Sequence, residues 1–414
     1  MSVEVVTLPH MTQIELPVGR SRWDLRARAE DIVPIRRHTS PTPVADVRSA
    51  VREALEHPLR FEALRRALTP DDRIALVVDE SLPQIPTLLT PILEHLSAAG
   101  ITPERITLLT SGIAPHNDWI AELPEAFEEV RTEVHDPADR RRMSYLASTH
   151  EGRRLYLNRT LVDADQVVIL SGRGYDPLLG YSGGAASIFP AFGDVESRQA
   201  HAADLTMSPP GHGVRPALQE AEEVVWLMGA PFLIQVVEGL GDEIAYVCGG
   251  LVETAADARR ALDERWHITV GRRTGTVVAS VSGDPARHGF AALASALACA
   301  ARVVDPGGCI VVLSESEPQP GAGGELLRKA EEPEQALRAI AHDQPADMGA
   351  VFQWASAAAR ARIYVACDLP PEAIEEWFAT PVTSPREVQR LLDAPGTCLF
   401  IPDGHKTLAT LVGK

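Results

Sequence analysis

Short apolar runs rich in β-branched residues alternate with segments of helical periodicity along most of this chain, and this alternation restricts the fold most strongly. The predicted strands are 74–78, 106–110, 166–170, 276–281, 309–313, 363–366 and 398–401. Segments with helical apolar spacing fall between them, such as 88–98, which stops at Gly100, and 291–304, which ends before Asp305. Buried parallel strands connected by covering helices produce this alternation. The sequence therefore predicts an α/β protein with mainly parallel sheets.

The chain is long enough for more than one domain. At roughly 100–200 residues per domain, its 414 residues allow two or three. Residues 255–266 have the charged pattern of a polar helix, and the glycine-flanked segment 271–275 precedes a new predicted strand. We therefore expect an N-terminal domain at 1–254, a linking helix and loop at 255–275, and a C-terminal α/β domain at 276–414. The two domains are expected to enclose an interdomain cleft.

Charge and cysteine usage exclude several classes of function. With 39 Lys and Arg against 57 Asp and Glu, the net charge of −18 disfavours nucleic acid and membrane surfaces as partners. Five cysteines without CxxC spacing support neither a disulfide framework nor a zinc site. The N-terminus lacks a signal-peptide pattern, and no window reaches the roughly 18 apolar residues of a spanning helix. We expect a cytoplasmic protein with a small-molecule substrate, and the sequence leaves its oligomeric state open.

The most unusual stretch is 171–186, which follows the predicted strand 166–170 and contains five glycines. In α/β folds, ligands bind at the loops that follow the carboxyl ends of parallel strands. Glycines there let backbone N–H groups approach a phosphate or a carboxylate closely. We therefore predict that this loop binds a ligand. The alternative is a tight irregular connection in which the glycines only supply positive φ angles.

Three common site motifs are absent or fail on their context. Residues 180–184 fit the pattern G-x-S-x-G, but about ten residues separate the serine from the preceding strand, whereas a nucleophile elbow follows its strand directly. The pair Gly172 and Gly174 lacks the third glycine of a dinucleotide-binding fingerprint. The sequence contains no GxxxxGK[ST] phosphate loop. None of these chemistries is therefore supported.

Several short motifs, taken in their order along the chain, resemble the nickel-pincer lactate racemase family. They are Asp79-Glu80-Ser81-Leu82-Pro83, Thr110-Ser111-Gly112, Gly180-Tyr181-Ser182-Gly183-Gly184 followed by Pro190 and His201, Asp305-Pro306-Gly307-Gly308, and Ile401-Pro402-Asp403-Gly404. Each is common alone, so the resemblance depends on their order and spacing over nearly the whole chain. It implies two α/β domains around a nickel-containing pyridinium nucleotide. It also implies racemisation of a 2-hydroxy acid by hydride transfer to the cofactor and back, with two histidines acting on the substrate hydroxyl.

The resemblance also implies that most of the family's catalytic residues are replaced. The lysine that tethers the cofactor falls on Ala186, and the arginine that binds the substrate falls on Leu82. The two catalytic histidines fall on Asp176 and Ala114, with His116 two residues beyond the latter. A leucine offers no donor, so the carboxylate anchor at that position loses roughly 2–5 kcal/mol. Aspartate has an ordinary pKa near 4 and needs burial to act near neutral pH.

Among the family's ligand-binding positions, the resemblance implies that some are replaced and that others keep their residue type. In the second domain a Tyr-Gln pair and a lysine fall on Ala291, Ala292 and Ser295. The metal-ligand histidine has a counterpart in His201. A carboxylate at a strand end, such as that of Asp79, commonly holds a ribose hydroxyl or caps the next helix. The predicted cofactor-binding residues are Asp79, Ser81, Gly112, Ser182, Gly183 and Gly184.

Three functional hypotheses follow. The first is a divergent lactate-racemase-like isomerase or epimerase that acts on a small hydroxylated acid, with Asp176 and His116 as acid–base residues and His201 as the nickel ligand. Its nickel-pincer nucleotide would bind without the tethering lysine. The second is a non-catalytic family member that binds a nucleotide or another small molecule. The third is a nickel-independent acid–base enzyme, a lyase or dehydratase, which needs a buried carboxylate with a raised pKa in the same cleft.

Overall fold

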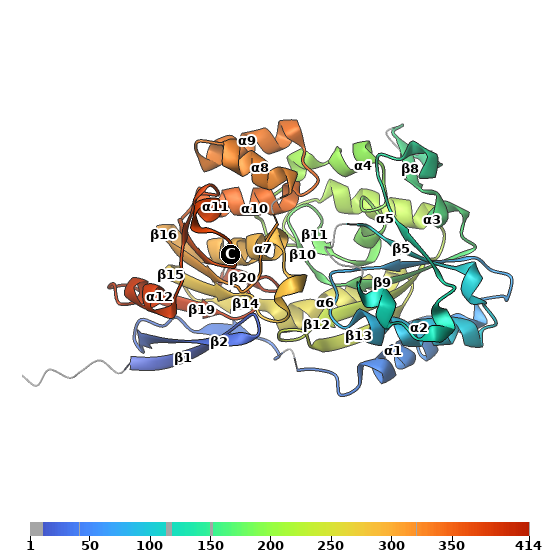
Figure 1. The fold of residues 1–414 in the computed structure, drawn as a ribbon, viewed down its shortest axis with the longest axis horizontal. Coiled ribbons are helices and arrows are strands. Elements are labelled where there is room, and N and C mark those ends of the chain that lie inside the picture. Colours follow the sequence, from blue (N-terminus) through green and yellow to red (C-terminus); the bar gives the residue numbers. More distant parts are fainter. Residues whose placement is uncertain (1–10, 41, 113–117, 150–151, 320, 414) are drawn as a thin grey trace, which may run out of the picture. The chain divides into compact units, whose positions relative to one another are not determined.

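The computed structural model describes residues 11–40, 42–112, 118–149, 152–319 and 321–413 (Figure 1). The chain divides into two compact units. We call residues 39–266 the central unit, and residues 1–38 together with 267–414 the terminal unit. Each unit is an α/β structure with a mainly parallel sheet and its own hydrophobic core. The predicted fold class is therefore confirmed.

The central unit is built on a six-stranded sheet with the order β13-β12-β9-β4-β5-β6. All neighbouring pairs are parallel except β12 and β13, which are antiparallel. The strands are β4 (Ile74–Val78), β5 (Ile106–Thr110), β6 (Arg131–Val134), β9 (Gln166–Gly172), β12 (Phe232–Glu238) and β13 (Ile244–Gly250). The chain runs from β4 to β5 and β6 on one side and then returns to β9 and β12 on the other. The strand order therefore reverses between β4 and β9.

Helices and two hairpins complete the central unit. The helices are α1 (Val47–Glu56), α2 (Ile85–Ala98), α3 (Arg159–Asp163), α4 (Val195–Gln199), α5 (Pro216–Leu227) and α6 (Ala255–Trp266). The hairpins pair β7 (Met143–Ser148) with β8 (Arg154–Asn158), and β10 (Gly174–Asp176) with β11 (Gly180–Ser182). Helix α2 ends as predicted, because Gly100 takes a φ of +89° that other residues rarely adopt.

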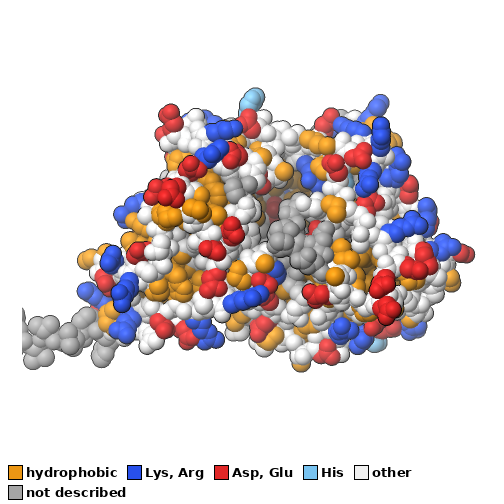
Figure 2. All heavy atoms as spheres, viewed as in Figure 1, with side chains coloured by type: hydrophobic (Ala, Val, Ile, Leu, Met, Phe, Trp, Pro, Cys, Tyr) orange, Lys and Arg blue, Asp and Glu red, His pale blue; other side chains and the backbone are white. Residues whose placement is uncertain are grey.

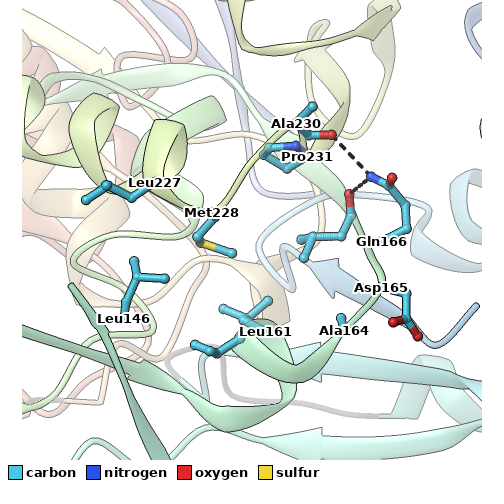
Figure 3. A pocket seen from close by; sticks show the side chains of 11 residues that line it. Leu146, Leu161, Ala164, Asp165, Gln166, Leu227, Met228, Ala230 and Pro231 are labelled. Carbon is cyan, nitrogen blue, oxygen red and sulfur yellow. Dashed lines mark hydrogen bonds between the residues drawn. The ribbon is translucent and has the colours of Figure 1, made fainter.

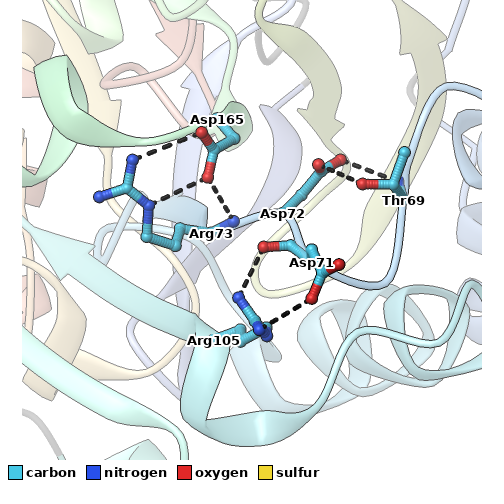
Figure 4. Close-up of polar contacts among 6 residues, drawn as sticks. All are labelled: Thr69, Asp71, Asp72, Arg73, Arg105 and Asp165. Carbon is cyan, nitrogen blue, oxygen red and sulfur yellow. Dashed lines mark hydrogen bonds and ion pairs between the residues drawn. The ribbon is translucent and has the colours of Figure 1, made fainter.

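Ion pairs join the amino ends of the central strands (Figure 4). The guanidinium of Arg73, just before β4, donates to the carboxylate of Asp165, just before β9, with an Nε–Oδ2 distance of 3.0 Å. Arg105, just before β5, donates to the Asp71 carboxylate over 3.0 Å. Acidic and basic side chains are interspersed in the same way over the face that Figure 2 shows. Exposed pairs of this kind contribute about 0–1 kcal/mol each, so the sheet depends mainly on its buried apolar faces.

The terminal unit contains a five-stranded parallel sheet with the order β18-β17-β16-β15-β19. Its strands are β15 (Thr274–Ser280), β16 (Val304–Leu313), β17 (Arg362–Ala366), β18 (Ala379–Pro381) and β19 (Cys398–Ile401). A smaller sheet joins β3 (Ile35–Arg37), β14 (His267–Val270) and β20 (Leu408–Leu411). The helices are α7 (Phe290–Ala301), α8 (Ala322–Lys329), α9 (Pro333–Asp343), α10 (Met348–Ala358), α11 (Pro371–Glu375) and α12 (Pro385–Leu392).

The first described residues belong to the terminal unit, although the sequence placed them in the N-terminal domain. The antiparallel hairpin of β1 (Met11–Val18) and β2 (Ser21–Arg28) carries Leu16 and Leu25 on one face. These two side chains pack into one core cluster with Val278 of β15. The predicted linking segment 255–275 contains the boundary between the units, after Trp266, and its helical part α6 lies in the central unit. Charged and apolar residues alternate along the hairpin, and this pattern does not indicate that it packs against a strand far away in the sequence.

None of the helices within the described ranges combines the length and the hydrophobicity that crossing a bilayer requires.

The buried strand β4 should be sensitive to loss of side-chain volume. Leu76 is fully buried in the core of the central unit, so Leu76→Ala should lower the free energy of unfolding by about 2–5 kcal/mol. Val134 at the end of β6 is 46% exposed, and Val134→Ala should change it by less than about 0.5 kcal/mol. Urea denaturation of both variants tests this, and equal effects would contradict the assignment of β4 to the core.

Candidate functional site

The candidate site lies at the carboxyl edge of the central sheet, where the strand order reverses between β4 and β9. Crevices at such reversal points are where open α/β sheets bind ligands. Val78, the last residue of β4, lies opposite Leu170 of β9. The residues that follow these strands therefore meet at one edge. They include the predicted residues Asp79 and Ser81 and the start of the glycine-rich loop.

The Asp79 carboxylate joins the ends of β4 and β9. Its Oδ2 accepts the backbone N–H of Gly172 over 3.0 Å, and its Oδ1 accepts the N–H and the hydroxyl of Ser81 over 3.1 and 2.5 Å. Both oxygens are therefore occupied by the chain's own donors. The geometry gives Asp79 and Ser81 a role in shaping the edge of the sheet.

Leu82 is buried beside the same strand end, with only 2% of its surface exposed. A β-carbon built on Gly172 would lie 3.1 Å from Cδ2 of Leu82. The position at which the resemblance implies a substrate-binding arginine thus carries an apolar contact within the fold. No carboxylate can be anchored there by charge.

Glu80 is the carboxylate at this edge that sequence reasoning missed. Both of its carboxylate oxygens are buried. Burial raises the pKa of Glu80, while the Thr110 hydroxyl and the Trp119 indole act in the opposite direction. Its position directly after a buried strand, between Asp79 and Ser81, was the available signal. Only packing in the folded chain, near Thr110 of β5 and Trp119, buries that carboxyl.

The hairpin β10–β11 shapes the glycine-rich loop, and Asp176 closes its turn. The Oδ1 of Asp176 accepts the backbone N–H groups of Leu178 and Leu179 over 2.8 and 2.7 Å. Burial raises the pKa of Asp176, and these two hydrogen bonds oppose the rise. One carboxylate oxygen of Asp176, the predicted acid–base residue, is therefore engaged in hydrogen bonds within the turn. This turn leads to Gly180, whose φ is +81°.

Arg173 lies in the same loop and carries the least satisfied charge of the described site residues. Its backbone N–H donates to the Val236 carbonyl over 2.8 Å, which fixes the residue beside β12. The side chain is 6% exposed, and Nε, Nη1 and Nη2 are all buried without a hydrogen-bond partner. Burial, and then the charge of Arg259, lowers the pKa of Arg173 to about 10. Burying an unpaired ion costs on the order of several kcal/mol.

Gly183 and Gly184 make room for this arginine. A β-carbon on Gly183 would lie 2.1 Å from the Gly172 carbonyl oxygen, and one on Gly184 would lie 2.7 Å from Nη1 of Arg173. Both glycines also have positive φ angles, +78° and +65°. The neighbouring Ser182 pairs with Gly174 across the hairpin. The predicted glycine pair therefore borders a buried cation.

A hydrogen-bonded group holds the hairpin against α6. The hydroxyls of Tyr175 and Tyr181 donate to the two oxygens of the Asp263 carboxylate over 2.9 and 2.7 Å. The guanidinium of Arg259 lies over the Tyr181 ring and donates to Glu222 over 3.1 Å. Asp263 is therefore committed to two tyrosines and leaves Arg173 without an ion pair.

His201, the predicted nickel ligand, is held between two carboxylates. Its Nδ1 lies 2.9 Å from Oδ2 of Asp204, and its Nε2 lies 2.6 Å from Oε2 of Glu220. Glu220 also pairs with Arg153. Both ring nitrogens therefore already have carboxylate partners, one in the turn that follows His201 and one on α5.

The remaining predicted positions are less informative. Gly112 follows β5 with a φ of +69°, whereas Ala114 and His116 lie outside the described residues. In the terminal unit, Ser295 on α7 donates to Oε1 of Gln353 over 3.4 Å. That hydroxyl serves the packing of α7 against α10.

The terminal unit contains a histidine pair that the sequence did not indicate. The rings of His288 and His405 lie edge to face, with centroids 4.7 Å apart, and the His288 Nε2 lies 2.9 Å from the Ser282 carbonyl oxygen. Both ring nitrogens of His405 are buried without a partner. Burial and the nearby charges hold the pKa of His405 well below its ordinary value. His405 is therefore neutral at neutral pH.

The five cysteines are all free thiols. Burial raises the pKa of each, to about 11 for Cys248, Cys309 and Cys398 and about 12 for Cys299 and Cys367. Thiols with such pKa values are poor nucleophiles and poor metal ligands. Cysteine chemistry therefore plays no part in the candidate site.

A pocket of about 220 Å³ lies at the opposite, amino edge of the central sheet (Figure 3). Leu146, Leu161, Leu227 and Met228 are among the residues that line it. The Gln166 amide within it donates to the carbonyls of Val167 and Ala230. The Gln166 amide nitrogen thus already has partners within the fold, and the pocket is separate from the candidate site.

Comparison with known proteins assigns part of this chain to a domain family. Residues 18–211 match the family model of the lactate racemase N-terminal domain. This part of the chain is therefore a lactate racemase N-terminal domain by its sequence. The lactate racemase apoprotein from Thermoanaerobacterium thermosaccharolyticum has a similar structure, with a TM-score of 0.81 and 17% identity over 96% of this chain and 100% of that one.

A protein from Thermotoga maritima has a more distant likeness. The TM-score is 0.63 and the identity is 13%, over 88% of this chain and 97% of that one. No curated protein matches this chain. At such identities the structural likeness establishes the fold, and the chemistry has to be argued from the site residues.

The site residues do not fit the nickel-pincer nucleotide on which the lactate racemase family depends. Ala186 is buried and has no amine with which to tether a cofactor. Both ring nitrogens of His201 face carboxylates. Within the described ranges, no group of three or more His, Cys, Asp or Glu side chains is arranged to hold a metal ion. Where the resemblance implies a tethering lysine and a substrate-binding arginine, the chain has Ala186 and Leu82, and the ring nitrogens of His201 are already engaged.

The raised pKa of Glu80 predicts a pH-dependent cost to stability. As pH rises from the ordinary value of 4.5, the unfolded chain releases this proton while the folded chain still holds it, so stability falls. Glu80→Gln removes this cost and should become increasingly more stable than the parent as pH rises from about 4 to about 7. Urea denaturation over this range measures the difference. The exposed control Glu128→Gln should show no such divergence, and parallel curves for Glu80→Gln would contradict the burial of an ionisable carboxyl.

Proposed function

We propose that this chain is a divergent member of the lactate racemase family that acts on a small hydroxylated carboxylic acid by acid–base chemistry, without the nickel-pincer nucleotide. The reaction is an isomerisation, such as an epimerisation, or the loss of water from the acid. The observation that carries this proposal is the buried carboxyl of Glu80 at the carboxyl edge of the sheet, with its raised pKa. A pKa moved toward neutrality is what a proton-transfer group requires.

The replaced positions support chemistry without nickel. Hydride transfer to a tethered nucleotide needs the tether and the metal ligand, and the chain has Ala186 and a doubly paired His201 instead. Proton transfer needs only a positioned acid or base. Glu80 supplies one that can hold a proton on its carboxyl oxygen and exchange it with the substrate.

Non-catalytic binding of a small molecule is the second candidate. The unpartnered guanidinium of Arg173 favours it, because a buried cation can hold an anionic ligand whether or not a reaction follows. Turnover separates the two candidates. A protein that binds hydroxy acids and leaves them unchanged has the second function.

Nickel content tests the absence of the cofactor. After co-expression with a pathway that makes the pincer nucleotide, the purified protein should contain far less than one nickel per chain by mass spectrometry. His201→Ala should leave that content unchanged, because His201 is engaged by Asp204 and Glu220. Stoichiometric nickel that disappears in His201→Ala would overturn the proposal.

Exchange of substrate hydrogen tests the acid–base chemistry. Incubation of nickel-free protein with a panel of 2- and 3-hydroxy acids in heavy water should give deuterium incorporation, loss of chirality or an unsaturated acid, followed by NMR and chiral chromatography. Glu80→Gln should lower kcat by about 10²–10⁴, whereas the exposed Glu128→Gln should retain full activity. A fully active Glu80→Gln variant would rule out Glu80 as the proton-transfer group.

A further inference from the structure

We propose that the central unit forms a two-fold symmetric dimer with a second copy of this chain, in which the indole ring of Trp226 enters the pocket at the amino edge of the other copy's sheet. The inference is independent of the proposed function. It starts from two features that lie next to each other in the chain, an exposed aromatic ring and the pocket shown in Figure 3. Both lie away from the candidate functional site.

Trp226 is an exposed aromatic residue at the carboxyl end of α5. Its side chain is 77% exposed, whereas the preceding residues Val224 and Val225 are buried in the central unit. Tryptophan is enriched at the centres of protein interfaces, because its ring covers a large apolar area and keeps one polar N–H group. Single exposed apolar side chains are common on protein surfaces, so the significance of Trp226 depends on what lies beside it.

The pocket begins one residue further along the chain. Its apolar lining includes Leu146 of β7, Leu161 of α3, and Leu227 and Met228 at the end of α5. Figure 3 shows these four side chains on one side of the pocket and Asp165 and Gln166 on the other. The pocket is therefore apolar on one side and polar on the other.

An indole ring matches this pocket in size and in polarity. An apolar cavity of roughly 150 Å³ already binds benzene, and this pocket has a volume of about 220 Å³. The ring would pack against the leucines and donate its N–H to the carboxylate of Asp165, which is 44% exposed. A carboxylate accepts about four hydrogen bonds, so Asp165 can accept the indole N–H as well as the bonds from Arg73.

The closeness of the ring and the pocket favours a second copy as the occupant. Where a projecting side chain and the pocket that receives it lie far apart on a molecule, copies join head to tail and the assembly stays open. Here Leu227, which directly follows Trp226, lines the pocket. A two-fold axis beside the pocket therefore lets each copy insert its ring into the other, and the assembly closes as a dimer.

The charges on the two sides of the pocket are complementary across such an axis. Glu223 lies three residues before Trp226 on α5, and Arg159 lies three residues before the pocket residue Val162 on α3. Residues three apart share one face of a helix. When the ring of one copy enters the pocket of the other, α5 meets α3 and Glu223 comes opposite Arg159 of the second copy.

The fold leaves these charges available for an intermolecular pair. Arg159 is exposed, and its guanidinium makes hydrogen bonds of 3.4 Å to a hydroxyl and a carbonyl oxygen rather than to an acid. The neighbouring Glu222, by contrast, pairs with Arg259 over 3.1 Å within the same chain. Because the net charge of −18 makes two copies repel each other, an interface between them needs opposite charges where they touch.

Sedimentation velocity of the full chain over a range of concentrations tests the dimer. The parent should show a reversible equilibrium between monomer and dimer. Trp226→Ala should raise the dissociation constant by about 30-fold or more, as for a central interface tryptophan. Ala164→Leu fills the pocket from inside and leaves the ring in place, so it should raise the constant by a similar factor.

Several results would overturn the inference. They are a monomer at every concentration, an open assembly larger than a dimer, and a dissociation constant that either variant leaves unchanged. Native mass spectrometry of the same samples would also overturn it by detecting a small molecule bound in the pocket of a monomer.

Val214 provides a matched control, because it is 73% exposed and precedes the opposite end of α5. Val214→Ser should leave the dissociation constant unchanged. Dilute Trp226→Ala should unfold at the same urea concentration as the dilute parent, because the exposed ring contributes little to the monomer. A lower urea midpoint for Trp226→Ala would assign the ring to the fold and count against the interface, as would an equal loss of dimer in Val214→Ser.

Exchange of the two charges tests the proposed arrangement of the helices. Arg159→Glu places acids opposite each other and should raise the dissociation constant by about 3- to 10-fold, and Glu223→Arg should do the same with two bases. The chain that carries both changes should dimerise as well as the parent. Losses that add in this double variant would overturn the pairing of α5 with α3 across the two-fold axis.

Discussion

The register between the parallel strands β4 and β9 is the constraint on which the candidate site depends. Val78 lies opposite Leu170, and the N–H of Asp79 donates to the Leu170 carbonyl over 3.0 Å, so the chain leaves both strands at one level. The Asp79 carboxylate then accepts the N–H of Gly172 and extends the join by one step. Glu80 and Arg173 are the next residues in the chain after Asp79 and Gly172, which this hydrogen bond connects. A shift of register by one residue would turn both side chains to the opposite face.

The charges at this edge of the sheet differ from those that the resemblance to lactate racemases implies. At the positions where the resemblance implies an arginine and a tethering lysine, the chain has the buried Leu82 and Ala186. In their place the loop holds the guanidinium of Arg173, which stands beside the paired glycines without a carboxylate. An unpaired buried ion lowers stability, and proteins tolerate such costs where a site uses them. The paired glycines and the guanidinium of Arg173 are thus two parts of one arrangement.

The strands that are buried on both faces were predictable from the sequence. Strands β4 and β5 coincide with the predicted runs, because continuous apolar and β-branched residues have few other places in an α/β fold. The hairpin β1–β2 was missed, since alternating charged and apolar residues reveal a strand only when its partner is known. Asp79, Gly183 and Gly184 were placed at the candidate site from their position after strands. Arg173 and Glu80 were not, because each is an ordinary residue type whose importance comes from burial.

The sequence by itself determined the parallel α/β fold and the glycine loop after β9, since these follow from local composition and from order along the chain. Only the tertiary structure decided which charges are satisfied. Residues far apart in sequence, such as His201 and Glu220 or Tyr181 and Asp263, neutralise or occupy one another. Those distant partners decide whether a side chain is paired within the protein or is left for a ligand. The reason is that burial removes the water that would otherwise satisfy every polar group.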